Sequence, residues 1–183
     1  MKLRSAIIGV ALATAGALAG AALHAQDTDA PPEKVAVNTQ PARGPVTNLP
    51  LPRFVSLKGS EGNARRGPSL SHRIDWVFRH NGMPLRVTAE FGHWRRVEDR
   101  DGAGGWVHYS LLSGVRSVII QDDMTELKMR PDPAAGVAAV AEAGAIARLG
   151  ECLRDWCRIT AEGEKGWVQK AQIWGVGAEE LRD

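Results

Sequence analysis

The sequence has little cysteine and lacks the motifs from which most enzyme and metal sites are built. It has only two cysteines, and with no histidine beside them they do not complete a four-ligand zinc site. It contains neither a phosphate-binding glycine-rich loop nor a serine in a nucleophile-elbow string. Four histidines fall in the first half of the folded part, but no two have a ligand spacing. We therefore expect a non-enzymatic protein that uses no metal and no cofactor.

The chain also lacks a strong net charge. The formal charge is +2, and it becomes 0 once the two cations Lys2 and Arg4 are removed. A nucleic-acid-binding protein carries a basic patch or stripe, so this balance argues against nucleic acid as a partner. Residues 50–115 hold ten basic and six acidic residues, whereas residues 117–177 hold seven and nine. This difference is what ordinary solvated surfaces also show.

The N-terminus has the pattern of a secretory signal peptide. Lys2 and Arg4 precede an apolar run over residues 6–23, and Ala25 is a small residue at a cleavage point. A membrane anchor is the competing interpretation, but the run is short for a span. No cysteine follows the run, which argues against a lipoprotein anchor. We expect cleavage after residue 25, a periplasmic or secreted protein, and no stable membrane span in the mature chain.

Residues 26–52 contain six prolines and almost no large apolar side chains. Such a composition cannot bury a core and is typical of an extended, disordered linker. We therefore expect residues 26–52 to be a spacer ahead of the folded part.

The remaining chain repeats itself. Gly82 is followed by Trp94 and then by Gly105-Trp106-Val107, and the same succession recurs from Gly144 through Trp156 to Gly166-Trp167-Val168. Two copies of one unit indicate a repeat architecture.

The repeated units have the pattern of strands. Leu85, Val87, Ala89 and Phe91 alternate with polar residues, so they are expected to face a core. The alanine-rich stretch over residues 134–143 favours helix by composition. It aligns with a strand-like stretch over residues 75–79 of the first copy, so we predict strand there. Short strands with glycine in the turns predict two small all-β domains, at residues 53–115 and 117–177.

The first domain opens with the string Gly-Asn-Ala-Arg-Arg-Gly-Pro-Ser over residues 62–69. This string, the glycine-bounded hairpin with a tryptophan on its return strand, and the closing Gly-Trp-Val together resemble bacterial SH3 (SH3b) domains. The second copy keeps Arg130 and Pro133 of the opening motif but lacks its Gly-Pro pair. The resemblance implies two tandem SH3-like five-stranded barrels, as in exported proteins of proteobacteria.

Cys152 and Cys157 flank a four-residue segment. If Arg154-Asp155 is a two-residue turn, the two cysteines face each other at a non-hydrogen-bonded pair, where side chains approach closely. An exported protein meets oxidising conditions, so we expect a disulfide that contributes about 2 kcal/mol. The equivalent positions in the first copy are Glu90 and Arg95, an opposite-charge pair. Free or reactive thiols are the alternative, although the spacing is not Cys-x-x-Cys.

Six tryptophans stand against one tyrosine and three phenylalanines. For Trp106 and Trp167 the core is the favoured location. For Trp94 and Trp156 core and groove are evenly balanced, because the resemblance implies an aromatic side chain presented to ligand there. The candidate ligand-binding groove consists of Trp94, Arg95, Arg96 and Tyr109. We expect a smaller ligand role for Trp156.

An aromatic, basic groove suits an acidic or proline-rich peptide or a cell-wall glycopeptide. The leading hypothesis is an exported binding module whose partner is peptidoglycan or a periplasmic protein or peptide. A structural or assembly protein, whose domains pack on each other or on a partner without a groove, is the alternative. An enzyme with an unrecognised site is the third possibility.

Overall fold

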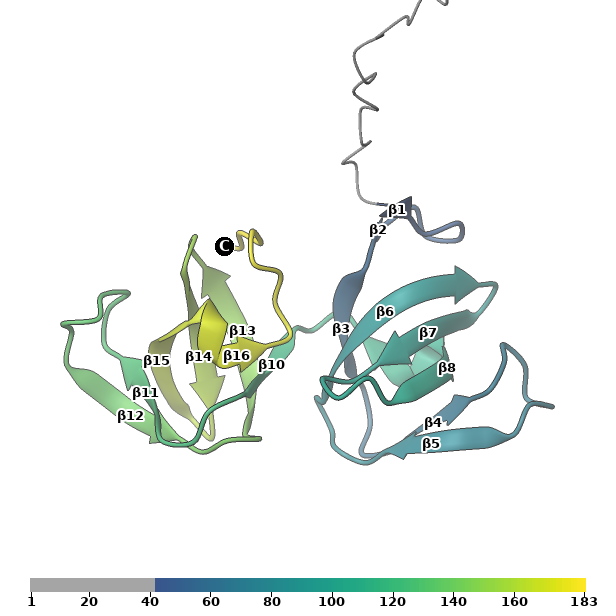
Figure 1. Ribbon diagram of the computed structural model, residues 1–183, viewed down its shortest axis with the longest axis horizontal. Helices are drawn as coiled ribbons and strands as arrows, with labels where there is room; N and C mark the ends of the chain where they lie inside the picture. Colours follow the sequence, from purple (N-terminus) through teal and green to yellow (C-terminus); the bar gives the residue numbers. More distant parts are fainter. Residues whose placement is uncertain (1–41) are drawn as a thin grey trace, which may run out of the picture. The chain divides into compact units, whose positions relative to one another are not determined.

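The computed structural model describes residues 42–183. The predicted signal peptide and residues 26–41 of the predicted linker lie outside the described residues. The described part contains strands and two three-residue 3-10 turns, arranged as two large sheets in tandem (Figure 1). The all-β fold class is thereby confirmed. Within residues 42–183 no helix has the length and apolarity to cross a membrane.

The first sheet has seven strands in the order β5-β4-β8-β7-β6-β3-β9. They are β3 (Arg53–Leu57), β4 (Gly62–Arg65), β5 (Ile74–Phe78), β6 (Pro84–Phe91), β7 (Trp94–Glu98), β8 (Gly104–His108) and β9 (Leu112–Ser113). The 3-10 turn η1 (Tyr109–Leu111) lies between β8 and β9.

The second sheet repeats this order as β12-β11-β15-β14-β13-β10-β16. Its strands are β10 (Ser117–Ile120), β11 (Thr125–Lys128), β12 (Val137–Ala141), β13 (Ile146–Cys152), β14 (Trp156–Ala161), β15 (Glu164–Gln169) and β16 (Ile173–Trp174), with η2 (Lys170–Gln172) before the last. We expected five strands per domain and the structure has seven. The additional strands include β9 and β16, which are two residues long and too short to show a period in the sequence.

The sequence repeat corresponds to equivalent strand pairing in the two domains. Trp94 and Trp156 begin the equivalent strands β7 and β14, and Trp106 and Trp167 lie opposite Arg65 and Lys128. The alanine-rich stretch forms β12, which pairs with β11 as β5 pairs with β4. The strand prediction for that stretch is correct, because pairing along a neighbouring strand outweighs the helix preference of alanine.

Each domain encloses its own core, built mainly of aliphatic side chains. The buried residues of the first core are Leu57, Ala64, Phe78, Leu85, Val87, Val97 and Val107. Those of the second are Val118, Ile120, Leu127, Ala141, Ala147, Leu149, Cys152, Cys157, Ile159, Val168 and Ile173. No tryptophan belongs to either set.

A β-bulge in β6 changes which side chains face the first core. The pairing of β6 with β7 shifts between Val87 and Ala89. Since alternate residues of a strand face opposite sides, one extra residue reverses the faces beyond it. Glu90 is therefore buried, while Phe91 is 63% exposed. The expectation that Phe91 faces the core is wrong for this reason, and β13 has the same irregularity between Leu149 and Cys152.

The last residues assigned to the linker are structured. β1 (Ala42–Arg43) pairs with β2 (Pro50–Leu51) as a small hairpin. Within it Gly44 is buried, and a Cβ atom there would collide with the Glu90 carboxyl group. The linker prediction thus fails for residues 42–51, because the hairpin is held by contacts to the folded domain that composition does not reveal.

The glycine of each Gly-Trp-Val string allows a close crossing of strands. A Cβ atom at Gly105 would lie 2.6 Å from the backbone oxygen of Arg65 in β4, and one at Gly166 would lie 2.6 Å from the Cβ of Leu127 in β11. These crossings join the β4–β5 and β11–β12 hairpins to the rest of their sheets. Glycine is required here because any side chain would separate the strands.

We predict that Gly105→Ala and Gly166→Ala each destabilise their domain by about 1–3 kcal/mol, the usual cost of forcing extra atoms into a packed site. Urea denaturation followed by fluorescence measures the loss. Gly114→Ala is the matched control, since a Cβ atom at Gly114 would have no other atom within 4 Å. Equal stability of the Gly105 and Gly114 variants would contradict the close-crossing explanation.

Candidate functional site

The outer face of β7 and β8 carries most of the residues expected to form a groove. Along β7 the buried Arg95 and Val97 alternate with the less buried Trp94 and Arg96. Trp94 lies opposite His108 on β8, and Arg96 lies opposite Trp106. Strand alternation therefore gathers aromatic, imidazole and guanidinium groups on one side of the sheet.

At one end of this face lies a cluster of rings that we call the His–aromatic cluster: His93, Trp94, His108 and Tyr109. The ring centroids of Trp94 and His108 are 5.5 Å apart in an edge-to-face arrangement. His108 and Tyr109 are 5.0 Å apart, and His93 and Tyr109 are 5.5 Å apart. These are typical distances for favourable aromatic pairs.

Local contacts hold the cluster in place. The Nδ1 atom of His108 lies 2.7 Å from the Ser110 hydroxyl group. The backbone amide of Tyr109 donates to the carbonyl of His93 over 2.9 Å. Tyr109 is nevertheless half exposed. The cluster thus presents fixed rings with accessible surface, as a binding surface requires.

Of the four predicted groove residues, Arg95 lies elsewhere. It is buried, and its guanidinium group donates to the carbonyls of Gly92 and Trp94 and faces Glu90. Trp94, Arg96 and Tyr109 remain on or beside the outer face. The predicted groove does not include His93 and His108, whose rings the structure places in the cluster. The signal that identifies them in the sequence is the turn position of His93 and the two-residue step from Trp106 to His108.

Glu90 is the centre of a buried polar network. Its side chain is 0% exposed, and it accepts hydrogen bonds from the Val46 amide, the Thr47 amide and hydroxyl group, and Arg53. Burial by itself raises the pKa of Glu90, but the hydrogen bonds from Thr47, Arg53 and Val46 outweigh it and lower the pKa to about 2. The carboxylate therefore stays ionised and binds the N-terminal hairpin to β6.

The second domain has a disulfide at the corresponding place. Cys152 and Cys157 are paired across β13 and β14 and bonded to each other. The backbone of Leu153 donates to the carbonyl of Trp156 over 2.8 Å, the turn geometry expected from the sequence. Cys152 also exchanges backbone hydrogen bonds with Arg182 near the C-terminus.

Two open hollows lie beside Trp156, where the sequence predicted the smaller ligand role. They measure about 730 and 370 Å³, and Trp156 and Gln169 line both. The larger is also lined by Arg154, Asp155 and Glu179, and the smaller by Glu126, Lys128 and Gln172. The indole of Trp156 thus lies between two hollows whose linings combine apolar residues with charged groups of both signs.

None of the six tryptophans is among the buried residues, and Trp76 is almost half exposed. The core location favoured for Trp106 and Trp167 is therefore wrong: both are only partly buried, and the adjacent valines Val107 and Val168 fill the cores instead. The period of two explains this, because Val and Trp are neighbours in sequence and point to opposite faces.

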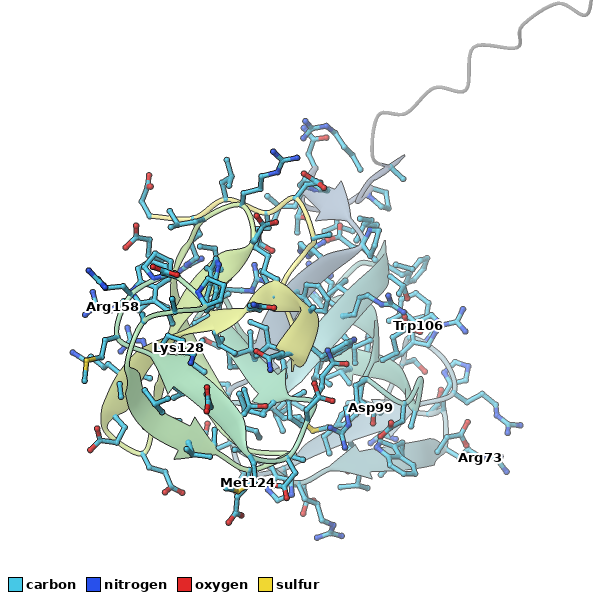
Figure 2. The ribbon with its side chains drawn as sticks, turned by 60° about the vertical axis from the view of Figure 1, so that its left-hand side comes forward. Arg73, Asp99, Trp106, Met124, Lys128 and Arg158 are labelled. Atoms are coloured by element: carbon cyan, nitrogen blue, oxygen red, sulfur yellow. A yellow bond between two sulfur atoms is a disulfide. The ribbon has the colours of Figure 1, made fainter. Side chains whose placement is uncertain are left out.

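Other polar groups have local roles. Asp99 lies in the turn between β7 and β8 (Figure 2), and its Oδ1 atom accepts from the amides of Asp101 and Ala103. Within residues 42–183 no three histidine, cysteine or carboxylate side chains converge as a metal site would require.

The two repeated sheets and their outer aromatic faces define a tandem SH3-like protein. The family model described as bacterial SH3 domain matches twice, at residues 58–114 and 122–175. These matches cover more than half of the chain, and the chain belongs to this family.

Comparison with curated proteins finds no match. Among solved structures, NlpC2 from Trichomonas vaginalis is 12% identical, with 67% of this chain and 48% of that chain covered and a TM-score of 0.32. NlpC1 from the same organism is 10% identical, with 72% and 48% covered and the same TM-score. The chain spans about half the length of these two proteins, and a likeness at this TM-score carries no weight for function.

We predict that acid weakens the first domain through Glu90. A carboxylate whose pKa falls on folding stabilises the fold above its unfolded pKa, near 4.5, and this stabilisation is lost as the pH falls toward about 2. The shift corresponds to roughly 3 kcal/mol. Glu90→Gln should cost about 3–5 kcal/mol at neutral pH, because it leaves Arg53 and Arg95 without their counter-charge. Denaturation of both proteins over a pH series measures both effects.

The matched control is Glu98→Gln. Glu98 pairs with Arg86 in a more exposed place, so its loss should cost less than about 1 kcal/mol. If wild type and Glu90→Gln lost stability in parallel between neutral pH and pH 2, the acid effect would not come from Glu90.

Proposed function

We propose that this chain is an exported, non-enzymatic binding protein whose SH3-like domains hold a peptide or a cell-wall glycopeptide on their outer aromatic faces. The observation that carries the proposal is the placement of the tryptophans. Large apolar side chains are most stable inside a core, yet both cores are filled without any of the six. Exposed aromatic side chains in rigid surroundings are what binding surfaces use.

The chemistry of the faces suggests the class of ligand. In the first domain the rings of the His–aromatic cluster lie near Arg96, a combination that favours an acidic group attached to an apolar or ring-shaped body. In the second domain the hollows at Trp156 offer amide groups and charges of both signs. Cell-wall glycopeptides carry carboxylates, amides and sugar rings, so peptidoglycan is the partner that we propose.

Trp94→Ala tests the role of the first face. Since Trp94 is only partly buried, we predict a stability loss below about 2 kcal/mol, against about 3–5 kcal/mol for the core variant Phe78→Ala. Binding to purified peptidoglycan sacculi, measured by co-sedimentation, should fall severalfold in Trp94→Ala. Trp156→Ala is the parallel variant for the second domain.

Two results would contradict the proposal. Undiminished sedimentation of Trp94→Ala and Trp156→Ala with sacculi would show that these faces are not used. A failure of the wild-type chain to sediment with sacculi, together with capture by immobilised periplasmic peptides, would replace the cell wall by a peptide partner.

The proposed location has its own test. We predict that protein isolated from the native host begins at or close to Gln26 and lies outside the cytoplasm. N-terminal sequencing after cell fractionation checks both. Mass spectrometry with and without reductant should show the two-hydrogen difference of the Cys152–Cys157 bond. An intact Met1 and two free thiols on cytoplasmic protein would contradict export.

One observation favours the structural alternative. The two domains touch through specific contacts, with the ring of Phe54 edge-on to Trp174 at 5.1 Å and the hydroxyl groups of Ser56 and Ser117 2.6 Å apart. These contacts involve Trp174 and leave Trp94 and Trp156 available. Domain packing and ligand binding are therefore compatible in one molecule.

A further inference from the structure

Each large sheet ends in a strand whose outer edge has no partner among the described residues. These strands are β5 in the first sheet and β12 in the second (Figure 1). Each is five residues long. Both expose large apolar side chains: Ile74 and Trp76 are 44% and 46% exposed, and Val137 and Val140 are 39% and 49% exposed. Free strand edges with exposed apolar side chains are templates for pairing with another strand.

The β5 edge is basic. Arg66 and Arg73 both bind the carboxylate of Asp75, and Arg79 has only a 3.5 Å contact with Glu61. Arg73 projects away from its sheet next to the start of β5 (Figure 2). Three guanidinium groups therefore face two carboxylates, and a positive excess remains along this edge.

The β12 edge is acidic. Beside it lies an open hollow of about 320 Å³ whose apolar lining includes Leu127 and Ala141. Its charged lining consists of three carboxylates, Glu142, Glu162 and Glu164, and no basic side chain lines it. None of the three forms an ion pair within residues 42–183.

We propose that β5 of one molecule pairs with β12 of a second copy of this chain. The two edges have the same length and opposite charge. Their shapes are also complementary, because the exposed indole of Trp76 lies on the β5 edge and an apolar hollow lies beside the β12 edge. Two β5 edges would bring arginines against arginines, and two β12 edges would bring glutamates against glutamates. The contact is therefore heterologous, and since every copy keeps one edge of each kind, association proceeds head to tail. This inference does not depend on the proposed ligand, which uses other faces.

Sedimentation velocity of the full chain at rising concentration tests the proposal. We expect a weight-average mass that exceeds that of a dimer at high concentration. We also expect the association to weaken about tenfold or more in high salt, because the charges at an exposed edge are screened. A chain that stays monomeric at every concentration in low salt would overturn the proposal.

Two edge variants identify the surfaces. Trp76→Glu places a negative charge on β5, and Val140→Lys places a positive charge on β12; both sites are exposed, and thermal melts verify the folds. Each variant alone should be monomeric, while a mixture of the two should associate, because each supplies the intact edge that the other lacks. Leu181→Glu, at an exposed position next to the residue that bridges to β13, is the control and should associate like wild type.

Other outcomes would contradict the pairing. If Val140→Lys still associates while Trp76→Glu does not, the interface joins two β5 edges. The reverse result would indicate two β12 edges. Monomers of both variants that do not associate on mixing would show that the edges are not complementary.

Discussion

The rest of the molecule depends on the side chain that the bulge turns inward in the β6–β7 hairpin of the first domain and in the β13–β14 hairpin of the second. In the first domain the bulge turns Glu90 inward, and in the second it turns Cys152 inward. A carboxylate buried between strands must be paired, whereas two cysteines that face each other at this position can form a disulfide. Glu90 forms ion pairs with Arg53 and Arg95 and accepts hydrogen bonds from the N-terminal hairpin. Cys152 forms a disulfide with Cys157. The same backbone geometry is thus satisfied by charge in one copy and by a covalent bond in the other.

This arrangement also determines where ligand can bind. With the strand faces fixed beyond the bulge, Trp94 and Trp156 begin the return strands on the outward side. The cores are completed mainly by aliphatic side chains, with Phe78 as the aromatic member, and the six tryptophans lie outside both. The two faces differ in detail, since imidazole and phenol rings surround Trp94 whereas amides and mixed charges surround Trp156. A repeated fold therefore offers two chemically distinct surfaces.

Much of the fold could be predicted because it rests on local patterns. The equal spacing of Gly82–Trp94 and Gly144–Trp156 is enough to identify two copies of one unit. A two-residue turn at Arg154-Asp155 is enough to place the two cysteines opposite each other. The inward turn of Glu90 and the exposure of Phe91 could not be predicted, because a bulge reverses the faces without changing the sequence period before it. The structured hairpin at residues 42–51 escaped prediction for another reason. Its contacts come from Glu90, more than forty positions away in sequence. The site was predicted in part: Trp94, Arg96 and Tyr109 lie on or beside the outer face, whereas Arg95, between two outward residues of β7, points to the opposite side.

The fastening of the N-terminal hairpin has a mechanical consequence. A pull on the chain ahead of Ala42 first loads the two residue pairs between β1 and β2. These pairs open one after another, so they resist only weakly. The backbone hydrogen bonds of Gly44 with Asn48 and Leu49 are loaded next. The force then reaches Val46 and Thr47, whose amides, together with the Thr47 hydroxyl group, donate to the single carboxylate of Glu90. Tension on the first domain is thereby delivered to the end of β6, beside the turn that carries His93.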